Sequence, residues 1–452
     1  MNPSLIEKYN VPVPRYTSYP TVPHWDKNSF TLDIWKSKVK EAFQVYGKKE
    51  GISVYIHLPY CESLCTYCGC NTRITINHAV ERPYIEHVIQ EWKSYVALLG
   101  EKPVIQELHL GGGTPTFFSP ENLRYLIQSI NAEAIVSPYK EYSFEGHPAN
   151  TTKEHLQTLF EEGFTRVSFG IQDFDPKVQD TIHRFQSKEQ VAYVTNTARE
   201  IGYTSVNFDL VYGLPFQTIV SIQDTFSVLQ KLRPDRIAFY SYAHVPWLKP
   251  GQRKYTELDL PDNAFKRSLY ETGREIMESE GYMEIGMDHF SLPEDSLAIA
   301  LNEGKLHRNF MGYTTCSTTM LIGLGCSSIS DVGLGYAQNP KVVETYFAQV
   351  EKEGITAVSG HISSDEDRQI REWIKSLICT YQLNVSLDDM TAILQADGGS
   401  SLLEMVSEGL IHLTAESISV TEVGKSFIRN ICACLDPYYS LEVEKPMFSK
   451  SI

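Results

Sequence analysis

The fold is decided by the stretch from residue 166 to residue 211, which reads RVSFGIQDFDPKVQDTIHRFQSKEQVAYVTNTAREIGYTSVNFDLV. Two β-rich runs, Arg166–Ile171 and Ser205–Val211, stand near its ends. Between them, Ser187 and Gln190 have the spacing of a capping box, which predicts that a helix begins there. The stretch therefore predicts a strand, a helix and a second strand.

The same alternation extends along the chain in both directions. Further strands are expected at residues 53–57, 105–110, 142–145 and 236–241. Helical periodicity predicts helices between them, for example at Tyr84–Leu99, and a capping box of Thr151 and Glu154 predicts the start of another. Strands separated by helices indicate a parallel α/β sheet, either doubly wound or arranged as a barrel, with its site at the carboxyl ends of the strands.

Composition and charge restrict the class of protein. The chain has 452 residues, 42% of them hydrophobic and 21% charged, which excludes collagen-like, coiled-coil and disordered classes. The net charge of −16 argues against a nucleic-acid partner, which requires a basic face. No apolar run approaches the ~18 residues of a membrane span, and the first residues do not resemble a signal peptide. We therefore expect a cytoplasmic protein with reduced cysteines.

Four of the nine cysteines, Cys61, Cys65, Cys68 and Cys70, lie within ten residues. Zinc sites usually combine two close pairs of cysteines, and no second pair with the required spacing occurs in the sequence. Three cysteines separated by three and then two residues can instead bind three irons of a 4Fe–4S cluster. The fourth iron would then remain open for a small chelating molecule, as in other open catalytic metal sites.

The spacing Cys61-x3-Cys65-x2-Cys68 after a first strand resembles the radical S-adenosylmethionine (SAM) superfamily. Tyr67 before the third cysteine and Gly111–Gly113 after the next strand strengthen that resemblance. Over nearly the whole chain, the sequence is similar to the oxygen-independent coproporphyrinogen III dehydrogenase family. The similar stretches are residues 15–21, 55–61, 68–71, 170–174, 209–215, 242–244, 286–290, 307–310 and the tail at 448–452.

The resemblance implies an α/β fold built on a partial (β/α)6 radical-SAM barrel, which we expect at residues 51–290. It also implies an N-terminal arm at 1–50, a barrel extension and connection at 291–360, and a mostly helical, winged-helix-like C-terminal domain at 361–452. Winged helices also occur in DNA-binding proteins, but the acidic charge of this chain favours a packing or lid domain.

The resemblance further implies a site with a 4Fe–4S cluster and two molecules of SAM. Its metal ligands would be Cys61, Cys65 and Cys68, and its catalytic residues Tyr55, His57 and Cys70. The first SAM would contact Tyr55, Gly112, Glu145 and Ile329. The second SAM would contact Tyr67, Gly113, Thr114, Gln172, Arg184, Asp209 and Ala243.

Several of these residue types suit such roles on chemical grounds. Glu145 and Asp209 follow strands and can accept hydrogen bonds from ribose hydroxyls, and Arg184 can bind a carboxylate through two parallel hydrogen bonds. The alternative interpretation of each is a surface charge. Tyr55 and His57 share one face of their strand, although His57 could equally be a core histidine.

The reaction implied by the resemblance begins with one-electron reduction of the cluster, which cleaves SAM to a 5′-deoxyadenosyl radical. That radical takes a hydrogen atom from a propionate β-carbon, and loss of CO2 and one electron leaves a vinyl group. Two propionates of coproporphyrinogen III react in this way, giving protoporphyrinogen IX. We expect a one-electron donor such as flavodoxin or ferredoxin, a monomeric protein, and Arg15, Arg73 and Arg308 as cationic partners of the propionates.

Two stretches depart from the family pattern. Gly146-His147-Pro148-Ala149 replaces an acid-Pro-Arg sequence, and Cys316–Met320 replaces a Gly-Thr-Asp-like run. The alternative functions are a related radical-SAM enzyme that acts on haem and a haem-binding chaperone of the same superfamily. Cys70 and the Arg15-Tyr16-Thr17 arm, which such relatives generally lack, favour the decarboxylase.

Overall fold

A sheet of twelve strands forms the centre of the molecule, in the order β16-β15-β14-β13-β1-β4-β5-β6-β7-β8-β10-β9. It is seen in a computed structural model that describes residues 3–26, 28, 30–439, 448 and 450, so parts of the expected arm and C-terminal domain lie outside the described residues. Six neighbouring strands are parallel: β1 (Ile52–Leu58), β4 (Val104–Gly112), β5 (Ile135–Gly146), β6 (Arg166–Gln172), β7 (Ser205–Tyr212) and β8 (Arg236–Ser241).

The order of these six strands decides between the two arrangements that the sequence left open. Each strand pairs with the next one along the chain, without the reversal of order that a doubly wound sheet requires. Right-handed crossovers then place every connecting helix on the same face of the sheet. The predicted α/β class and partial (β/α)6 barrel are therefore confirmed.

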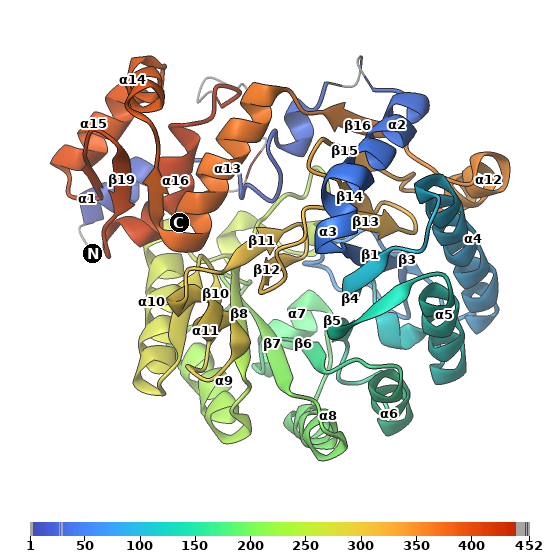
Figure 1. Ribbon diagram of the computed structural model, residues 1–452. Helices are drawn as coiled ribbons and strands as arrows, with labels where there is room; N and C mark the ends of the chain where they lie inside the picture. The colour runs from blue at the N-terminus through green and yellow to red at the C-terminus, as the bar shows by residue number, and fades with distance from the viewer. Residues whose placement is uncertain (1–2, 27, 29, 440–447, 449, 451–452) are drawn as a thin grey trace.

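Helices cover the outer face of these strands (Figure 1). They are α4 (Glu81–Leu99), α5 (Pro120–Ala132), α6 (Lys153–Glu161), α8 (Lys188–Ile201), α9 (Ile219–Leu232) and α10 (Asn263–Ser279). The short α7 (Pro176–Ile182) does not belong to this layer and packs against residues at the carboxyl ends of β7 and β8. The capping box of Ser187 and Gln190 forms as predicted. The predicted box of Thr151 and Glu154 is wrong, because Thr152 caps α6 together with His155. The Thr151 hydroxyl instead donates to the carbonyl of His147, at 2.9 Å.

The sheet continues with further strands on both sides of the six parallel strands. Next to β1 lie β13 (Leu321–Leu324), β14 (Ile329–Asp331), β15 (Gly335–Gln338) and β16 (Ser359–Ile362). Next to β8 lie β10 (His289–Ser291) and β9 (Met283–Gly286). Only β13 among these strands is parallel to its barrel neighbour. A hairpin of β11 (His307–Asn309) and β12 (Gly312–Thr314), with α11 (Ser296–Asn302) before it and α12 (Val343–Glu353) after it, completes this region.

The two faces of β1 show how the sequence separates the core from the site. Val54, Ile56 and Leu58 are fully buried in the large hydrophobic core under the helices. Tyr55 and His57 alternate with them and therefore point to the inner face of the barrel. The inner face thus carries polar side chains, while the outer face contributes hydrophobic packing.

The N-terminal segment contacts the C-terminal region and the strands at both edges of the sheet, near β9 and at β15. Helix α1 (Pro3–Tyr9) lies beside the C-terminal helices, and α2 (Leu32–Ala42) and α3 (Lys48–Glu50) lie over β13–β15 (Figure 1). Between them, Arg15 forms an ion pair with Asp288, which follows β9. Further along, the backbone N–H of Tyr19 donates to the hydroxyl of Tyr336 in β15, at 3.2 Å. The segment therefore spans the open side of the barrel.

The C-terminal region packs around a second hydrophobic core, to which the N-terminal segment contributes Tyr9 and the region of β9–β12 contributes Ile285 and Tyr313. Its elements are α13 (Asp365–Thr380), β17 (Gln382–Asn384), α14 (Leu387–Gln395), α15 (Gly399–Ser407), β18 (Ile411–Leu413), β19 (Ser417–Val420) and α16 (Ile428–Ala433). The hairpin of β18 and β19 is extended by β17 to a three-stranded sheet. Helices with a small sheet agree with the mostly helical domain that the sequence predicts.

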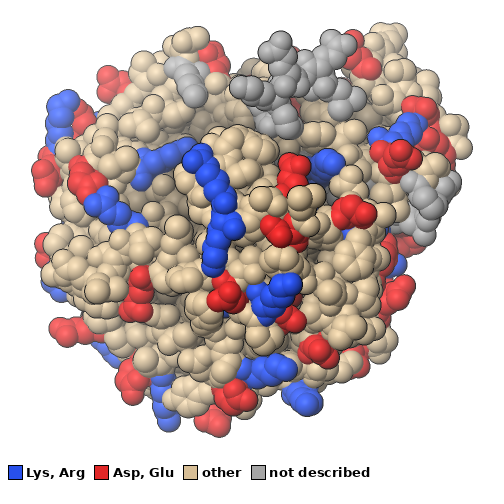
Figure 2. Space-filling model, turned by 180° about the vertical axis from the view of Figure 1, so that it is seen from behind, with Lys and Arg blue, Asp and Glu red and all other residues tan. Residues whose placement is uncertain are grey.

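Charged side chains of both signs are interspersed on the rear face of the molecule (Figure 2). The chain carries a net charge of −16, but basic side chains nevertheless gather at one place inside the molecule, beside the ends of β7 and β8. Among the described residues, no helix combines the length and the hydropathy needed to cross a membrane.

Candidate active site

The cysteine loop begins where β1 ends and passes through β2 (Tyr60–Cys61) to β3 (Arg73–Ile74). Backbone hydrogen bonds hold its middle: Cys68 N–H donates to the Cys65 carbonyl at 3.1 Å, and Thr66 N–H donates to the Ile182 carbonyl at 2.9 Å. All four cysteines of the loop line one cavity of about 570 Å³ at the carboxyl ends of the parallel strands. The loop is therefore fixed to α7 and presents its sulfur atoms to a common space.

Polar groups surround the sulfur atoms of this loop. The Nη1 atom of Arg184 donates to Cys65 Sγ at 3.6 Å, and Thr114 Oγ1 lies 3.4 Å from Cys61 Sγ. Burial raises the pKa of Cys61 to about 11, whereas a hydrogen bond from Cys70 lowers that of Cys68. Metal ligation requires thiolates, and the nearby guanidinium favours them.

The glycines after β4 are required by close packing against the loop that follows β1. A Cβ atom on Gly113 would lie 2.7 Å from the backbone of Pro59, and one on Gly112 would lie 2.6 Å from the His57 ring. Gly112 also has a φ of +112°, a region that favours glycine. These positions let the backbone of β4 approach the cysteine loop, which no larger residue would allow.

Tyr55 and His57 form a hydrogen-bonded pair behind this glycine run. The Nε2–H of His57 donates to the Asn71 carbonyl at 2.9 Å, so its Nδ1 accepts from the Tyr55 hydroxyl at 3.1 Å. The Tyr55 ring also stacks on His109, with 6.0 Å between ring centroids. Neither Tyr55 nor His57 lines the cysteine cavity, and they support residues that do.

Glu145, the next-to-last residue of β5, faces the cavity and is held on two sides. The Gly112 N–H donates to its Oε2 at 3.2 Å, and the Nε2 atom of His109 lies 3.5 Å from its Oε1. Burial alone would raise the pKa of Glu145, but the hydrogen bond and charge of His109 outweigh burial and the pKa is lowered. Glu145 is therefore an ionised hydrogen-bond acceptor.

Asp209 and Arg184 occupy the same cavity further along the sheet. Asp209 accepts hydrogen bonds from Ser168 Oγ at 2.8 Å and from Asn207 Nδ2 at 2.9 Å. Burial nevertheless raises the pKa of Asp209 to about 6. Arg184 donates to the Gly170 carbonyl, while its buried Nε has no hydrogen-bond partner among the described residues.

Most of the predicted site residues come together in this cavity. Its lining includes Cys61, Cys65, Tyr67, Cys68, Cys70, Gly112, Gly113, Thr114, Glu145, Gln172, Arg184, Asp209 and Ala243. Ile329 does not line it. Ile329 lies on β14, beside Gly323 of β13, and Gly323 in turn pairs with Tyr55 of β1. The packing is close, because a Cβ atom on Gly323 would lie 2.5 Å from the carbonyl oxygen of Ile329.

The three predicted cationic partners of the substrate do not form one group. Arg15 pairs with Asp288, and Arg308 donates through Nη1 to the carbonyl oxygens of Arg15 and Tyr16, at 2.9 and 3.0 Å. Arg73 is half exposed in β3 and pairs with a carboxylate on α12, 3.0 Å away. Arg15 in the arm and Arg308 in β11 therefore lie close together, and Arg73 lies apart from them.

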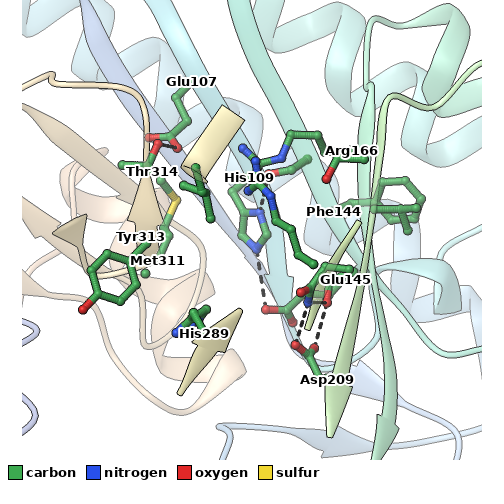
Figure 3. A pocket seen from close by; sticks show the side chains of 18 of the residues that line it. Glu107, His109, Phe144, Glu145, Arg166, Asp209, His289, Met311, Tyr313 and Thr314 are labelled. Atoms are coloured by element: carbon green, nitrogen blue, oxygen red, sulfur yellow. Dashed lines mark hydrogen bonds and ion pairs between the residues drawn. The ribbon is translucent and has the colours of Figure 1, made fainter. Parts of the chain in front are cut away.

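A second, smaller cavity of about 130 Å³ continues from Glu145 and Asp209 into the barrel (Figure 3). His109 and Arg166 project into it from the barrel strands, and His289 and Tyr313 face them from β10 and β12. The sequence interpretation did not include His109, Ser168 or Asn207. The alternation of side chains along a strand could have indicated two of them. His109 is two residues from Gly111, and Asn207 is two residues from Asp209, so each shares a face of its strand with a predicted site residue.

Comparison with known proteins agrees with this geometry. Residues 55–229 match the profile of the Radical SAM superfamily. The oxygen-independent coproporphyrinogen III oxidase of Salmonella typhimurium is 37% identical over 454 residues, covering 99% of this chain and 98% of that protein. The protein of the same name from Synechocystis sp. is 35% identical over 458 residues, covering 99% and 97%. The chain belongs to the oxygen-independent coproporphyrinogen III oxidase family.

A solved structure supports membership of this family at the level of the whole chain. Coproporphyrinogen III oxidase from Escherichia coli, described as a radical SAM enzyme, has a TM-score of 0.90 to this chain at 35% identity. The match covers 97% of this chain and 99% of the other. The oxidase family is the one that the sequence motifs indicated, so that interpretation is confirmed.

The donor set fits the iron–sulfur cluster that a radical SAM oxidase requires. Cys61, Cys65 and Cys68 present soft sulfur ligands to one cavity, as cluster ligation demands. In the described part of the chain, no three His, Cys, Asp or Glu side chains are close enough together to hold a single metal ion. Three cysteines around one cavity suit a cluster, in which each thiolate binds a different iron.

The two departures from the oxidase pattern lie at different ends of the barrel. His147 lines the cysteine cavity, and its Nδ1 accepts a hydrogen bond from the Ala149 N–H at 3.1 Å. The second stretch lies at the amino ends of the strands, where Thr318 Oγ1 is 2.6 Å from Ser53 Oγ in β1. Only the first departure therefore changes the surroundings of the cysteine loop.

Proposed function

We propose that this chain catalyses the oxidative decarboxylation of coproporphyrinogen III to protoporphyrinogen IX. In each of two propionate side chains, the β-carbon loses a hydrogen atom, and CO2 and one electron leave, so that a vinyl group forms. The observation that carries the proposal is one cavity that contains three loop cysteines together with Glu145 and Asp209, in a chain that matches this oxidase family over its whole length.

The cofactors of the proposal are a 4Fe–4S cluster held by Cys61, Cys65 and Cys68, and SAM. When bound, they supply a carbon-centred radical that removes the hydrogen atom from the substrate. The contribution of the protein is to position the reacting groups and to exclude water and oxygen. The hydrogen-bonded Tyr55–His57 pair and the close packing at Gly113 serve this role, because they fix the walls of the cavity.

Two molecules of SAM form the finer part of the proposal. The first would contact Tyr55, Gly112, Glu145 and Ile329. The second would contact Tyr67, Gly113, Thr114, Gln172, Arg184, Asp209 and Ala243. Two features support two sites: Glu145 and Asp209 are separate carboxylates, and the buried Nε of Arg184 still needs an acceptor. A carboxylate of a methionine moiety would provide that acceptor.

The remaining partners also belong to the proposal. Cluster reduction needs a one-electron carrier such as flavodoxin or ferredoxin, and we propose that the chain works as a monomer in the cytoplasm. Cys70 lies one residue beyond Cys68, and its N–H donates to the Cys68 sulfur at 3.4 Å. We propose that Cys70 serves the reaction as a cavity residue and is not a cluster ligand.

The test is an anaerobic assay of the reconstituted protein with SAM, a reductant and coproporphyrinogen III. We expect two CO2 per substrate and protoporphyrinogen IX as the product, together with 5′-deoxyadenosine. Cys68→Ala should abolish all three products, whereas Cys316→Ala, a cysteine outside the cavity, should retain them. Conversion of haem, or binding of haem without turnover, would replace this proposal with one of the two alternative functions.

A further inference from the structure

A small cavity of about 40 Å³ lies beside the cysteine cavity, at the ends of β7 and β8. Ser241, the last residue of β8, lines both cavities. The volume is enough for one carboxylate-sized group and too small for a ring. A side chain that extends from a molecule bound near the cysteine loop could therefore enter it past Ser241.

The lining of this cavity is unusually basic for a chain with a net charge of −16. Four cationic side chains line it: Arg15, Arg267, Lys425 and Arg429. Its two acidic side chains are Glu284 and Asp288, and Asp288 is paired with Arg15. Burial and the nearby charge of Arg15 lower the pKa of Arg429 to about 9, as expected where positive charges are crowded.

Arg267 is the member of this group that points to a missing ligand. Its side chain is 11% exposed, and its guanidinium lies over the Tyr270 ring, 4.9 Å from the centroid. One end of the guanidinium donates to Glu271. Its buried Nε has no hydrogen-bond partner among the described residues. A buried donor without an acceptor is costly, and a carboxylate would satisfy it.

Two of the other cations, Arg429 and Lys425, have partners that explain their positions, whereas Arg267 keeps a buried N–H without an acceptor among the described residues. Arg429 donates to the carbonyl oxygens of Val13, Pro14 and Lys450, so it holds the N-terminal arm. Lys425 pairs with Glu422 at 2.6 Å. Their charges still contribute to the potential in the cavity, but substitution of Arg429 would also disturb the arm.

We propose that this cavity is an anion subsite that binds one non-reacting propionate of the tetrapyrrole substrate, with Arg267 as its principal ligand. The proposal rests on the proposed function, because the substrate of that reaction carries four propionates and only two react. A propionate held beside β8 would fix the orientation of the macrocycle, and thereby determine which side chain faces the cysteine cavity. Arg267 thus acts as a specificity-determining residue.

The test compares Arg267→Gln with a matched control on the same helix. Arg274 also pairs with Glu271, at 2.9 Å, but it does not line the cavity. The probe is coproporphyrin III, the stable oxidised form of the substrate, bound to cluster-loaded protein with SAM present. We expect Arg267→Gln to weaken its binding at least about tenfold, Arg267→Lys to restore part of it, and Arg274→Gln to stay within about twofold.

A second probe separates loss of charge recognition from structural damage. The tetramethyl ester of coproporphyrin III lacks the carboxylates, so Arg267→Gln should not weaken its binding. Turnover should show a raised KM for coproporphyrinogen III, with kcat and the Kd of SAM retained. Unchanged binding of coproporphyrin III, or an equal loss for the ester, would overturn the subsite. If the wild-type protein decarboxylates coproporphyrinogen III in that case, the proposed function still stands, whereas a wild type without turnover contradicts the function itself.

Discussion

The Nε2 atom of His109 lies 3.5 Å from Oε1 of Glu145, across the neighbouring strands β4 and β5 (Figure 3). The other ring nitrogen of His109 lies 2.8 Å from the hydroxyl of Ser143 in β5. Glu145 is therefore held from inside the barrel by His109, and from the cavity side by the N–H of Gly112. This arrangement keeps an ionised carboxylate in one orientation before any ligand arrives.

His109 is expected to control SAM binding through Glu145. Replacing it with Phe removes the donor, raises the pKa of Glu145 and frees its side chain, so SAM affinity at the cluster should fall about tenfold. His109→Gln retains a donor and should lose less. Equilibrium dialysis with labelled SAM measures both variants. Wild-type affinity in His109→Phe would show that Glu145 does not need this partner.

The neighbouring cysteines Cys68 and Cys70 should behave differently. Cys68→Ala should lose most of the iron and the visible absorption of the reconstituted protein, because a cluster held by two thiolates is poorly retained. Cys70→Ser should keep the cluster and lose decarboxylation. Iron and sulfide analysis beside the activity assay separates these outcomes. A cluster-free Cys70→Ser protein would identify Cys70 as a ligand.

Asp209 should make binding of the second SAM dependent on pH. Its pKa is raised to about 6 by burial, so the carboxylate is protonated below that pH, and SAM, a sulfonium cation, should bind more tightly as pH rises through 6. The pKa of Glu145 is lowered, so the first SAM should bind with little change over the same range. Titration with SAM from about pH 5 to about pH 8, a range that brackets the raised pKa of Asp209, measures both sites.

Asp209→Asn provides the control for that pH dependence. The variant should bind the second SAM at least about tenfold more weakly, because it loses one partner of a desolvated charge pair, and its residual affinity should not vary with pH. The first SAM should remain. Saturation of the wild-type protein at one SAM per chain would contradict the two-site proposal.

Gly113 and Gly69 offer a matched pair of glycines near the cysteine loop. A Cβ atom on Gly113 would clash with the backbone of Pro59, whereas one on Gly69 meets nothing within 4 Å. Gly113→Ala should lower the free energy of unfolding by about 1–3 kcal/mol and reduce iron retention. Gly69→Ala should change it by less than about 0.5 kcal/mol. Urea unfolding of the iron-free proteins measures the difference, and equal effects would argue against the packing explanation.

The sequence by itself determined the strands, the helices between them and the group of cysteines. These are local properties: a period of two or 3.6 residues, capping residues and short spacings are encoded within about ten residues. Even there, the capping box was placed one residue early, at Thr151 instead of Thr152, because Glu154 gives Thr151 the usual box spacing, whereas in the structure the Thr151 hydroxyl binds the His147 carbonyl. The family resemblance then predicted which strand ends form the cavity.

Only the tertiary structure decided which side chains hold the site residues in place. His109 reaches Glu145 because β4 and β5 are adjacent, and Arg267 reaches the cavity at Ser241 because α10 packs near the end of β8. It also separated Arg73 from Arg15 and Arg308, which the sequence had grouped by charge alone. Hydrogen bonds and charge interactions act over a few ångströms, and residues far apart along the chain reach that distance only when the sheet curls and its helices pack.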